Sequence, residues 1–163
     1  EKYASIWFGA KDENQTATNK PEKILAGSNH KRDQLAFDKD TIEIGIWEPF
    51  LLPSFFDSSK SITVTVPCHS SATSGNFILS ISLVGMADTE DEDPSASFVD
   101  FDAKTIHGTS HNLTYASKTI SSHGLSASDL VFPQLRRKAN DSSDTMGADL
   151  WVEGFEIRFE CTS

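Results

Sequence analysis

Residues 61–66 read Ser-Ile-Thr-Val-Thr-Val, and residues 76–84 read Asn-Phe-Ile-Leu-Ser-Ile-Ser-Leu-Val. Apolar and polar side chains alternate in both stretches. Successive side chains of a β-strand point to opposite faces of its sheet, so each stretch predicts a strand with one buried face. The apolar positions of these two strands, together with those of a third run that has the same spacing, are Ile62, Val64, Val66, Phe77, Leu79, Ile81, Leu83, Ile42, Ile44 and Ile46.

Weaker runs of the same kind continue outward from this centre, each bounded by Gly, Ser, Asp or Pro, and they predict about eight or nine strands. A change of apolar parity at Gly154 predicts a β-bulge or a close backbone approach. No long window shows a helical stripe, so little helix is expected beyond one short turn at residues 126–129. The additional strand-like runs are residues 3–8, 96–101, 112–119, 130–135 and 150–161.

Many short strands with polar turns and no intervening helices predict two antiparallel sheets packed face to face. We expect an all-β fold, a single antiparallel β-sandwich domain over residues 1–163. A jelly roll is favoured because residues 9–34 and 85–96 are long enough to cross between the sheets. We expect the polar segment 9–33 to be an ordered loop over the sandwich or against a neighbouring subunit.

The charge of the chain excludes some classes of partner. Its formal net charge of -10 opposes a phosphate backbone, so nucleic-acid binding is not expected. The one basic cluster, Arg136-Arg137-Lys138, is interpreted as a solvated loop because acidic residues follow it. No stretch reaches the roughly 20 apolar residues that cross a bilayer, so no membrane insertion is expected. The start at Glu1 is typical of a processed or excised piece.

The two cysteines, Cys68 and Cys161, are too few for a disulfide scaffold and lack zinc-site spacing. Both follow strand-like segments, so either a bridge between them or two buried free thiols is open. Free thiols are favoured.

Two groups of residues resemble metal ligands, and neither predicts a metal site or a cofactor. His107 and His111 have the four-residue spacing of a helical zinc motif, but Gly108 and Ser110 between them indicate a loop. The acidic run at residues 88–93 is suited to Ca²⁺ in charge but does not match the EF-hand spacing. Polar loop histidines and a solvated acidic loop are favoured.

No residues predict catalysis, because no Ser lies in a glycine-flanked elbow and the adjacent Cys68 and His69 point to opposite faces of a strand. We therefore expect no enzymatic activity. The three tryptophans, Trp7, Trp47 and Trp151, suit either a platform for stacking sugars or, more commonly, a core or subunit interface. Trp47 lies one step from the isoleucine series, which predicts that it faces outward, opposite to those isoleucines.

An ordered set of short patterns runs along nearly the whole chain and resembles a family of small structural proteins found among virion and tail-fibre genes of tailed bacteriophages. Phe77 stands where that family often has a Trp, and the acidic loop is denser than usual. The patterns are Trp7-Phe8 with Thr18-Asn19, Phe37-Asp38, Pro53 to Asp57 before Ile62 to Val66, Gly75-Asn76, Leu130 to Phe132, Leu135 to Arg137, Asp141 with Asp144, and Ala148 to Leu150 before a final strand.

The resemblance implies a non-enzymatic component of the virion, either capsid decoration or fibre, with other virion proteins as partners. The aromatic content and the long segment 9–33 predict self-association into a homo-oligomer, and the resemblance favours a trimer. The alternative prediction, from a different class, is a carbohydrate-binding adhesin module that contacts a host surface glycan. The sequence assigns no carbohydrate-binding residues.

Overall fold

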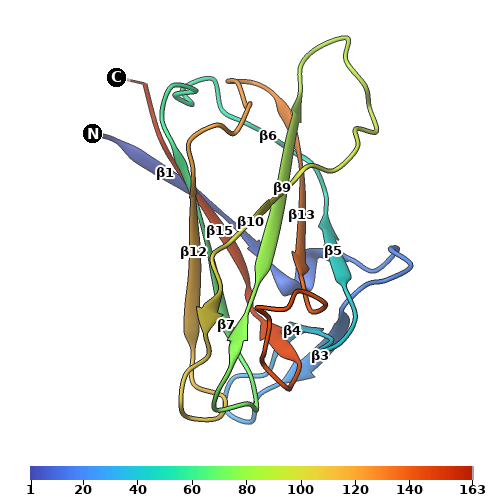
Figure 1. The fold of residues 1–163 in the computed structure, drawn as a ribbon. Helices are drawn as coiled ribbons and strands as arrows, with labels where there is room; N and C mark the ends of the chain where they lie inside the picture. The colour runs from blue at the N-terminus through green and yellow to red at the C-terminus, as the bar shows by residue number, and fades with distance from the viewer. Residues whose placement is uncertain (163) are drawn as a thin grey trace.

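Two antiparallel sheets pack face to face in the computed structural model, which describes residues 1–162 (Figure 1). The larger sheet has seven strands, in the order β1, β15, β7, β14, β4, β3, with β12 also paired to β7. These strands are β1 (Tyr3–Gly9), β3 (Glu22–Ala26), β4 (Arg32–Phe37), β7 (Ile62–His69), β12 (Thr114–Ile120), β14 (Leu150–Val152) and β15 (Gly154–Glu160).

The second sheet has six strands, in the order β10, β9, β13, β5, β2, with β6 paired to β13. Two further strands, β8 and β11, pair with each other, and a single 3-10 turn, η1 (Ala10–Asp12), follows β1. These strands are β2 (Glu13–Asn14), β5 (Glu43–Trp47), β6 (Phe50–Leu51), β8 (Asn76–Phe77), β9 (Leu79–Met86), β10 (Phe98–Asp100), β11 (Lys104–Thr105) and β13 (Leu130–Arg137).

The chain passes repeatedly from one sheet to the other, since β7, β9, β12, β13 and β14 belong alternately to the seven-stranded and six-stranded sheets. The prediction of an antiparallel, jelly-roll-like sandwich with little helix is confirmed. Pairing of β1 with β15 also brings the two ends of the chain together (Figure 1). Within residues 1–162, no helix has the length and apolar character needed to cross a bilayer.

The alternation of apolar and polar residues along the strands explains which side chains form the core. On β7 the side chains of Ile62, Val64 and Val66 are buried, while those of Thr63 and Thr65 face outward. Burying each such aliphatic side chain contributes about 1.5–3 kcal/mol. The buried face predicted for residues 77–83 is confirmed as well, although the structure divides this run between β8 and β9 and its last member is only half-buried. That face consists of Phe77, Leu79, Ile81 and Leu83.

The predicted orientation of Trp47 was wrong. Its side chain is 3% exposed, its Nε1 donates to the Gly9 carbonyl at 2.9 Å, and Ile44 and Ile46 take the outer, half-buried face. Gly45 explains the inversion, because a Cβ there would lie 3.0 Å from Cζ3 of Trp47. The glycine leaves room for the indole in the core. Because both faces of this strand carry apolar side chains, the alternation by itself does not determine which face points inward.

The segment from residue 9 to 33 was predicted as a loop, and the structure corrects this. It contains η1, β2 and β3, and β3 pairs with β4 to form one edge of the seven-stranded sheet. One of the two arguments for self-association is thereby removed, because the segment has a place in its own sandwich. Self-association remains a prediction.

The basic cluster was also misassigned as a solvated loop. Arg137 is fully buried at the end of β13, where Nη2 and Nε donate to the two carboxylate oxygens of Asp144 at 2.7 and 3.0 Å. Its remaining donors reach the carbonyls of Ala148 and Met146. Its pairing with Asp144 and its four hydrogen bonds offset the desolvation of the guanidinium and anchor the loop between β13 and β14.

Both cysteines are free thiols in the described chain. Cys68 is buried on β7, and burial raises the pKa of its thiol to about 12. Cys161 is half-buried and pairs through its backbone with Phe56. Of the two alternatives that the sequence left open, the structure shows thiols and not a bridge.

Candidate functional site

The outer face of the seven-stranded sheet carries large aromatic side chains. Strand parity places Tyr3 and Trp7 of β1, Tyr115 of β12 and Trp151 of β14 on this face, because their sequence neighbours point into the core. Trp7 is 53% exposed and Tyr115 is 58% exposed. Hydroxyl side chains lie between them, in two cross-strand pairs: Thr63 with Thr119 at 3.3 Å and Thr65 with Ser117 at 3.1 Å.

Trp7 lies against two glycines that face each other across β1 and β15. Gly9 pairs with Gly154, and a Cβ on Gly154 would lie 2.8 Å from Cζ2 of Trp7. A Cβ on Gly9 would lie 3.3 Å from Nε1 of the same indole. The backbone therefore supports one side of the ring, and the other side is left to solvent. The close backbone approach predicted at Gly154 is confirmed by the 2.3 Å separation of its notional Cβ from the Phe8 carbonyl oxygen.

Two hollows lie on this face, and Trp7 lines the first of them. The first, of about 480 Å³, contains Trp7 and the basic side chains of Lys11, Lys31 and Arg32. The second, of about 350 Å³, is bounded by Trp151, His69 and His111 and also by Arg32. Arg32 lines both, so the two hollows adjoin at this side chain, and we call them together the Trp7–Trp151 surface.

Four side chains beneath this surface are linked by hydrogen bonds, in the order Arg32, Glu153, Gln34 and His69. Arg32 donates to both carboxylate oxygens of Glu153, at 2.6 and 2.7 Å. Gln34 donates to Glu153 Oε1 at 2.7 Å, and its own Oε1 lies 3.1 Å from Nε2 of His69. The hydrogen bonds to Glu153 raise the pKa of Arg32. The network fixes several polar groups in the floor of the hollow.

His69 and His111 meet at the wall of the second hollow. Their Nδ1 atoms are 3.1 Å apart, and the centroid of Trp151 lies 5.4 Å from each imidazole. Burial lowers the pKa of His69, while the nearby carboxylate of Glu153 acts in the opposite direction. The cluster thus joins an aromatic surface to hydrogen-bonding groups.

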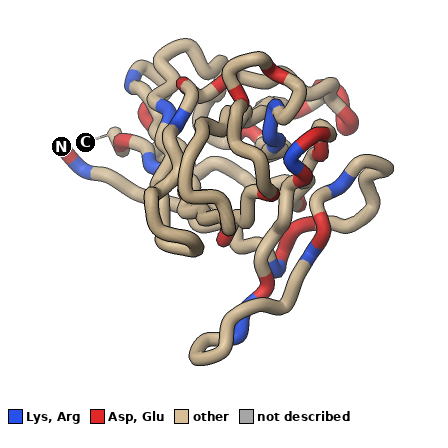
Figure 2. Tube along the Cα trace, turned by 60° about the horizontal axis from the view of Figure 1, so that its bottom comes forward, with Lys and Arg blue, Asp and Glu red and all other residues tan. Residues whose placement is uncertain are grey.

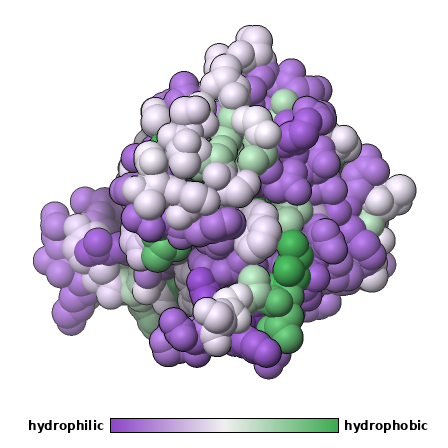
Figure 3. Space-filling model, turned by 90° about the horizontal axis from the view of Figure 1, so that it is seen from below, coloured by the Kyte–Doolittle hydropathy of each residue, from purple (hydrophilic) through white to green (hydrophobic). Residues whose placement is uncertain are grey.

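The surroundings of the surface are polar and carry both signs of charge. Acidic and basic residues are spread over the loops and do not form one basic patch (Figure 2). Seen from below, the end of the sandwich is mostly hydrophilic and has a narrow hydrophobic strip at one side (Figure 3).

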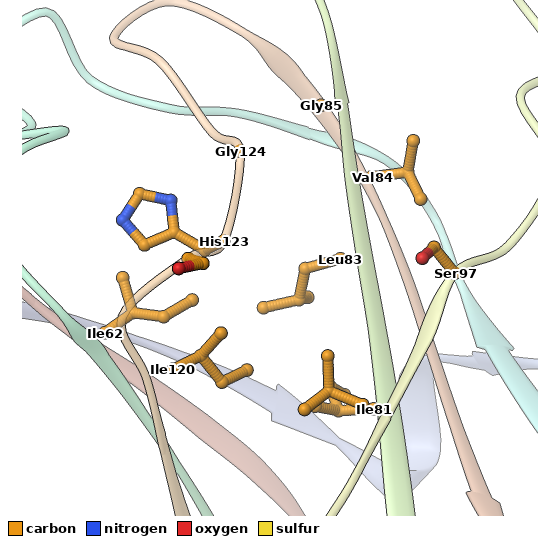
Figure 4. Close-up of a pocket in the computed structure, with 11 residues that line it drawn as sticks. Ile62, Ile81, Leu83, Val84, Gly85, Ser97, Ile120, His123 and Gly124 are labelled. Atoms are coloured by element: carbon orange, nitrogen blue, oxygen red, sulfur yellow. The ribbon is translucent and has the colours of Figure 1, made fainter.

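A different hollow, of about 260 Å³, opens between the two sheets at the edge formed by β12 and β9. Ile62 and Ile120 from one sheet face Ile81 and Leu83 from the other (Figure 4). The other lining residues are small, aliphatic or glycine, apart from His123 at the rim. Its lining contains Ser97, Ser122 and His123 but no Trp, Tyr or Phe ring on which a sugar could stack, so we place the candidate site on the Trp7–Trp151 surface.

The sequence identified part of this surface. Of the three tryptophans considered as a platform for sugars, Trp7 and Trp151 lie on this surface, whereas Trp47 is in the core. The spaced pair His107 and His111 does not meet, because Nδ1 of His107 accepts from the Thr109 amide while His111 contacts His69.

The sequence missed His69, Gln34, Arg32 and Glu153, whose partners are distant along the chain and carry no local pattern. Within residues 1–162, no three or more His, Cys, Asp or Glu side chains gather in a way that could hold a metal ion. The acidic segment 88–93 is exposed.

No protein-family model matches the chain, and no curated protein matches it in sequence. Solved structures do match. The CBM22-2 xylan-binding domain of Paenibacillus barcinonensis Xyn10C is 9% identical with a TM-score of 0.52, over 91% of this chain and 92% of that one. A xylan-binding module, CBM15, is 11% identical with a TM-score of 0.53, over 99% and 100%. At these identities the similarity establishes the fold.

These matches contradict the predicted function of a structural component of a virus particle. The solved structures that share the sandwich are described as carbohydrate-binding modules, and we correct the prediction accordingly. The resemblance to a bacteriophage protein family and the location in a virion are tested by none of these comparisons.

Proposed function

We propose that this chain binds a polysaccharide on the Trp7–Trp151 surface and that the binding involves no catalysis. The observation that carries the proposal is Trp7, whose indole is supported by Gly9 and Gly154 and is 53% exposed. Apolar ring faces of sugars stack on such aromatic surfaces, and hydrogen bonds from neighbouring polar groups orient them. A large exposed aromatic side chain that is held in place is well suited to this role.

The neighbouring groups supply the hydrogen bonds that sugar hydroxyls require. The side chains of Glu153 and Arg32 line the first hollow, whereas Gln34 is 2% exposed and holds Glu153 in place from below. Their positions are set by their mutual hydrogen bonds, so little side-chain entropy is lost when a ligand binds. Trp151 provides a second aromatic contact at the far end of the surface.

The shared fold supports this proposal and suggests the first ligand to test. Two of the similar solved structures are described as xylan-binding, and one of them is matched over nearly the full length of both chains. A glycan of a host cell surface, the partner in our alternative sequence prediction, has the same chemistry. Xylan and a panel of other soluble β-linked polysaccharides therefore serve as probes.

Affinity gel electrophoresis in soluble polysaccharide tests the proposal directly. We expect retardation of the wild-type chain by at least one member of the panel and loss of about tenfold in affinity in Trp7→Ala, the effect of removing about 1.4 kcal/mol of stacking. The matched control is Phe55→Ala, because Phe55 is similarly exposed, at 48%, and lines neither hollow. Binding to no polysaccharide, or equal losses in both variants, would contradict the proposal.

A further inference from the structure

The contact between His69 and His111 needs one proton and has no room for two. Their Nδ1 atoms are 3.1 Å apart, which is the length of an N–H···N hydrogen bond. One nitrogen must donate and the other must accept. If both nitrogens carried protons, two N–H donors would face each other at this distance and neither nitrogen would have a lone pair with which to accept.

The hydrogen-bonded chain behind His69 determines which nitrogen accepts. Gln34 uses its amide nitrogen to donate to Glu153, so its Oε1 is the atom that faces Nε2 of His69. His69 therefore carries its proton on Nε2, which donates to Gln34. Its Nδ1 keeps a lone pair, and His111 donates to that lone pair through Nδ1.

The charged groups around the pair favour at most one positive charge. Glu153, from the segment between β14 and β15, has its Oε1 3.8 Å from Nε2 of His69 and favours protonation. Arg32 on β4 neutralises that carboxylate and itself opposes a charge on His69, as does His111 from the loop before β12. Trp151 on β14 contributes an uncharged ring beside both imidazoles.

We infer that the His69–His111 pair makes ligand binding in the second hollow dependent on pH, with tight binding when the pair holds its contact and weakened binding when both imidazoles are charged. This inference rests on the proposed function, because it concerns the same surface. The His111 backbone is held by its amide, which donates to the Ser70 carbonyl at 2.7 Å. The imidazole is therefore the part that moves when the second proton arrives, and it forms one wall of the hollow.

The direction of the effect follows from the chemistry. A first proton leaves the contact intact, because one Nδ1 still has a lone pair to accept with. The second proton must charge a pair that is already positive and that includes His69, whose pKa is lowered by burial, so it binds below the ordinary imidazole value near pH 6.5. We expect affinity for the best polysaccharide of the panel to be constant from pH 8 to 7. Below about pH 6 it should fall by up to about tenfold per pH unit, the slope for one linked proton.

Two measurements on the whole chain test the inference. The first is nitrogen-detected NMR of the imidazoles, where we expect Nε2–H on His69 and Nδ1–H on His111 at pH 7.5, and titrations that change in each residue when the other is replaced. The second is affinity for the polysaccharide against pH in wild type, in His111→Asn and in the matched control His123→Asn. His123 follows β12, whereas His111 precedes it, so His123 lies at the opposite end of that strand, where its imidazole bonds to the Lys60 carbonyl.

The expected result is an acid-dependent loss of affinity in wild type and in His123→Asn and a flat profile in His111→Asn. Binding that is independent of pH in wild type would overturn the inference and leave the proposed function intact. Imidazoles that titrate independently of each other would also overturn it, even if no polysaccharide binds. Absence of polysaccharide binding at every pH would instead count against the proposed function, and the NMR titration would still decide whether the pair shares a proton.

Discussion

The outer faces of the two sheets both carry aromatic side chains, yet only one presents an open ring. On the six-stranded sheet, Phe98 is covered by the guanidinium of Arg136, 4.0 Å from the ring centroid. On the seven-stranded sheet, Tyr3 is covered in the same way by Arg158 at 4.2 Å. Within residues 1–162, Trp7 has no such cation over its ring and rests on glycines. An exposed aromatic is available to a ligand only when the protein itself does not occupy its face.

The apolar residues of the six-stranded face are also differently placed. Ile44 and Ile46 are half-buried there and pair with Arg136 and Gln134, and Phe132 pairs with Val84, which is also half-buried. The seven-stranded face instead places exposed aromatic rings, such as those of Trp7 and Tyr115, beside hydroxyl and charged groups. A sugar needs both stacking and hydrogen bonds, so the second composition is the better match.

The largest expected effect is loss of the whole fold, and with it the outer faces of both sheets. Ile81→Asp places a charge in the core shared by the two sheets, where Ile81 is 1% exposed, and should cost several kcal/mol of unfolding free energy. Thermal unfolding followed by circular dichroism measures this. The control is Leu51→Asp, at a side chain that is 66% exposed. A soluble Ile81→Asp chain with unchanged melting temperature would show that the core is misassigned.

A second substitution separates the aromatic ring from its support. Gly154→Ala should destabilise the fold by about 1–3 kcal/mol, because Gly154 has φ of 144° and a Cβ would meet the Phe8 carbonyl. It should also displace the indole of Trp7 and weaken polysaccharide binding. Gly108→Ala is the matched control, because a Cβ there has no atom within 4 Å. Equal melting temperatures and equal binding in the two variants would refute the supporting role of the glycine.

The third substitution exposes the covered ring of the other sheet. Arg136→Ala removes the cation from Phe98 and should cost about 0.5–1 kcal/mol of stability, with polysaccharide binding unchanged. Chemical denaturation and affinity electrophoresis give the two readouts. A loss of binding as large as that in Trp7→Ala would move the site to the six-stranded face.

The smallest expected effect concerns the stability of the fold against pH. Because burial lowers the pKa of His69, the folded chain binds its proton less readily than the unfolded chain. The stabilisation is fully present above the ordinary value near pH 6.5 and is lost as the pH falls through the lower pKa of the folded chain. The melting temperature should decline between pH 7 and 5, and less so in His69→Gln. Identical declines in both chains would assign the effect to other groups.

The strands and most of their buried faces were determined by the sequence, because alternation is a local property with a period of two residues. Ile62, Val64 and Val66 show this well, since only polar residues separate them. Trp47 shows the limit, because both parities of its strand are apolar and the space beside Gly45 decides which one points inward.

The candidate site was decided by tertiary structure. Gly9 lies opposite Gly154, and His69 meets His111 across 42 positions, through pairings and contacts between segments that are distant in the chain. A two-residue period contains no information on which distant strand will be the neighbour or at what register. The support beneath Trp7, the contact between the two imidazoles and the hollow that they line exist only once the strands have paired.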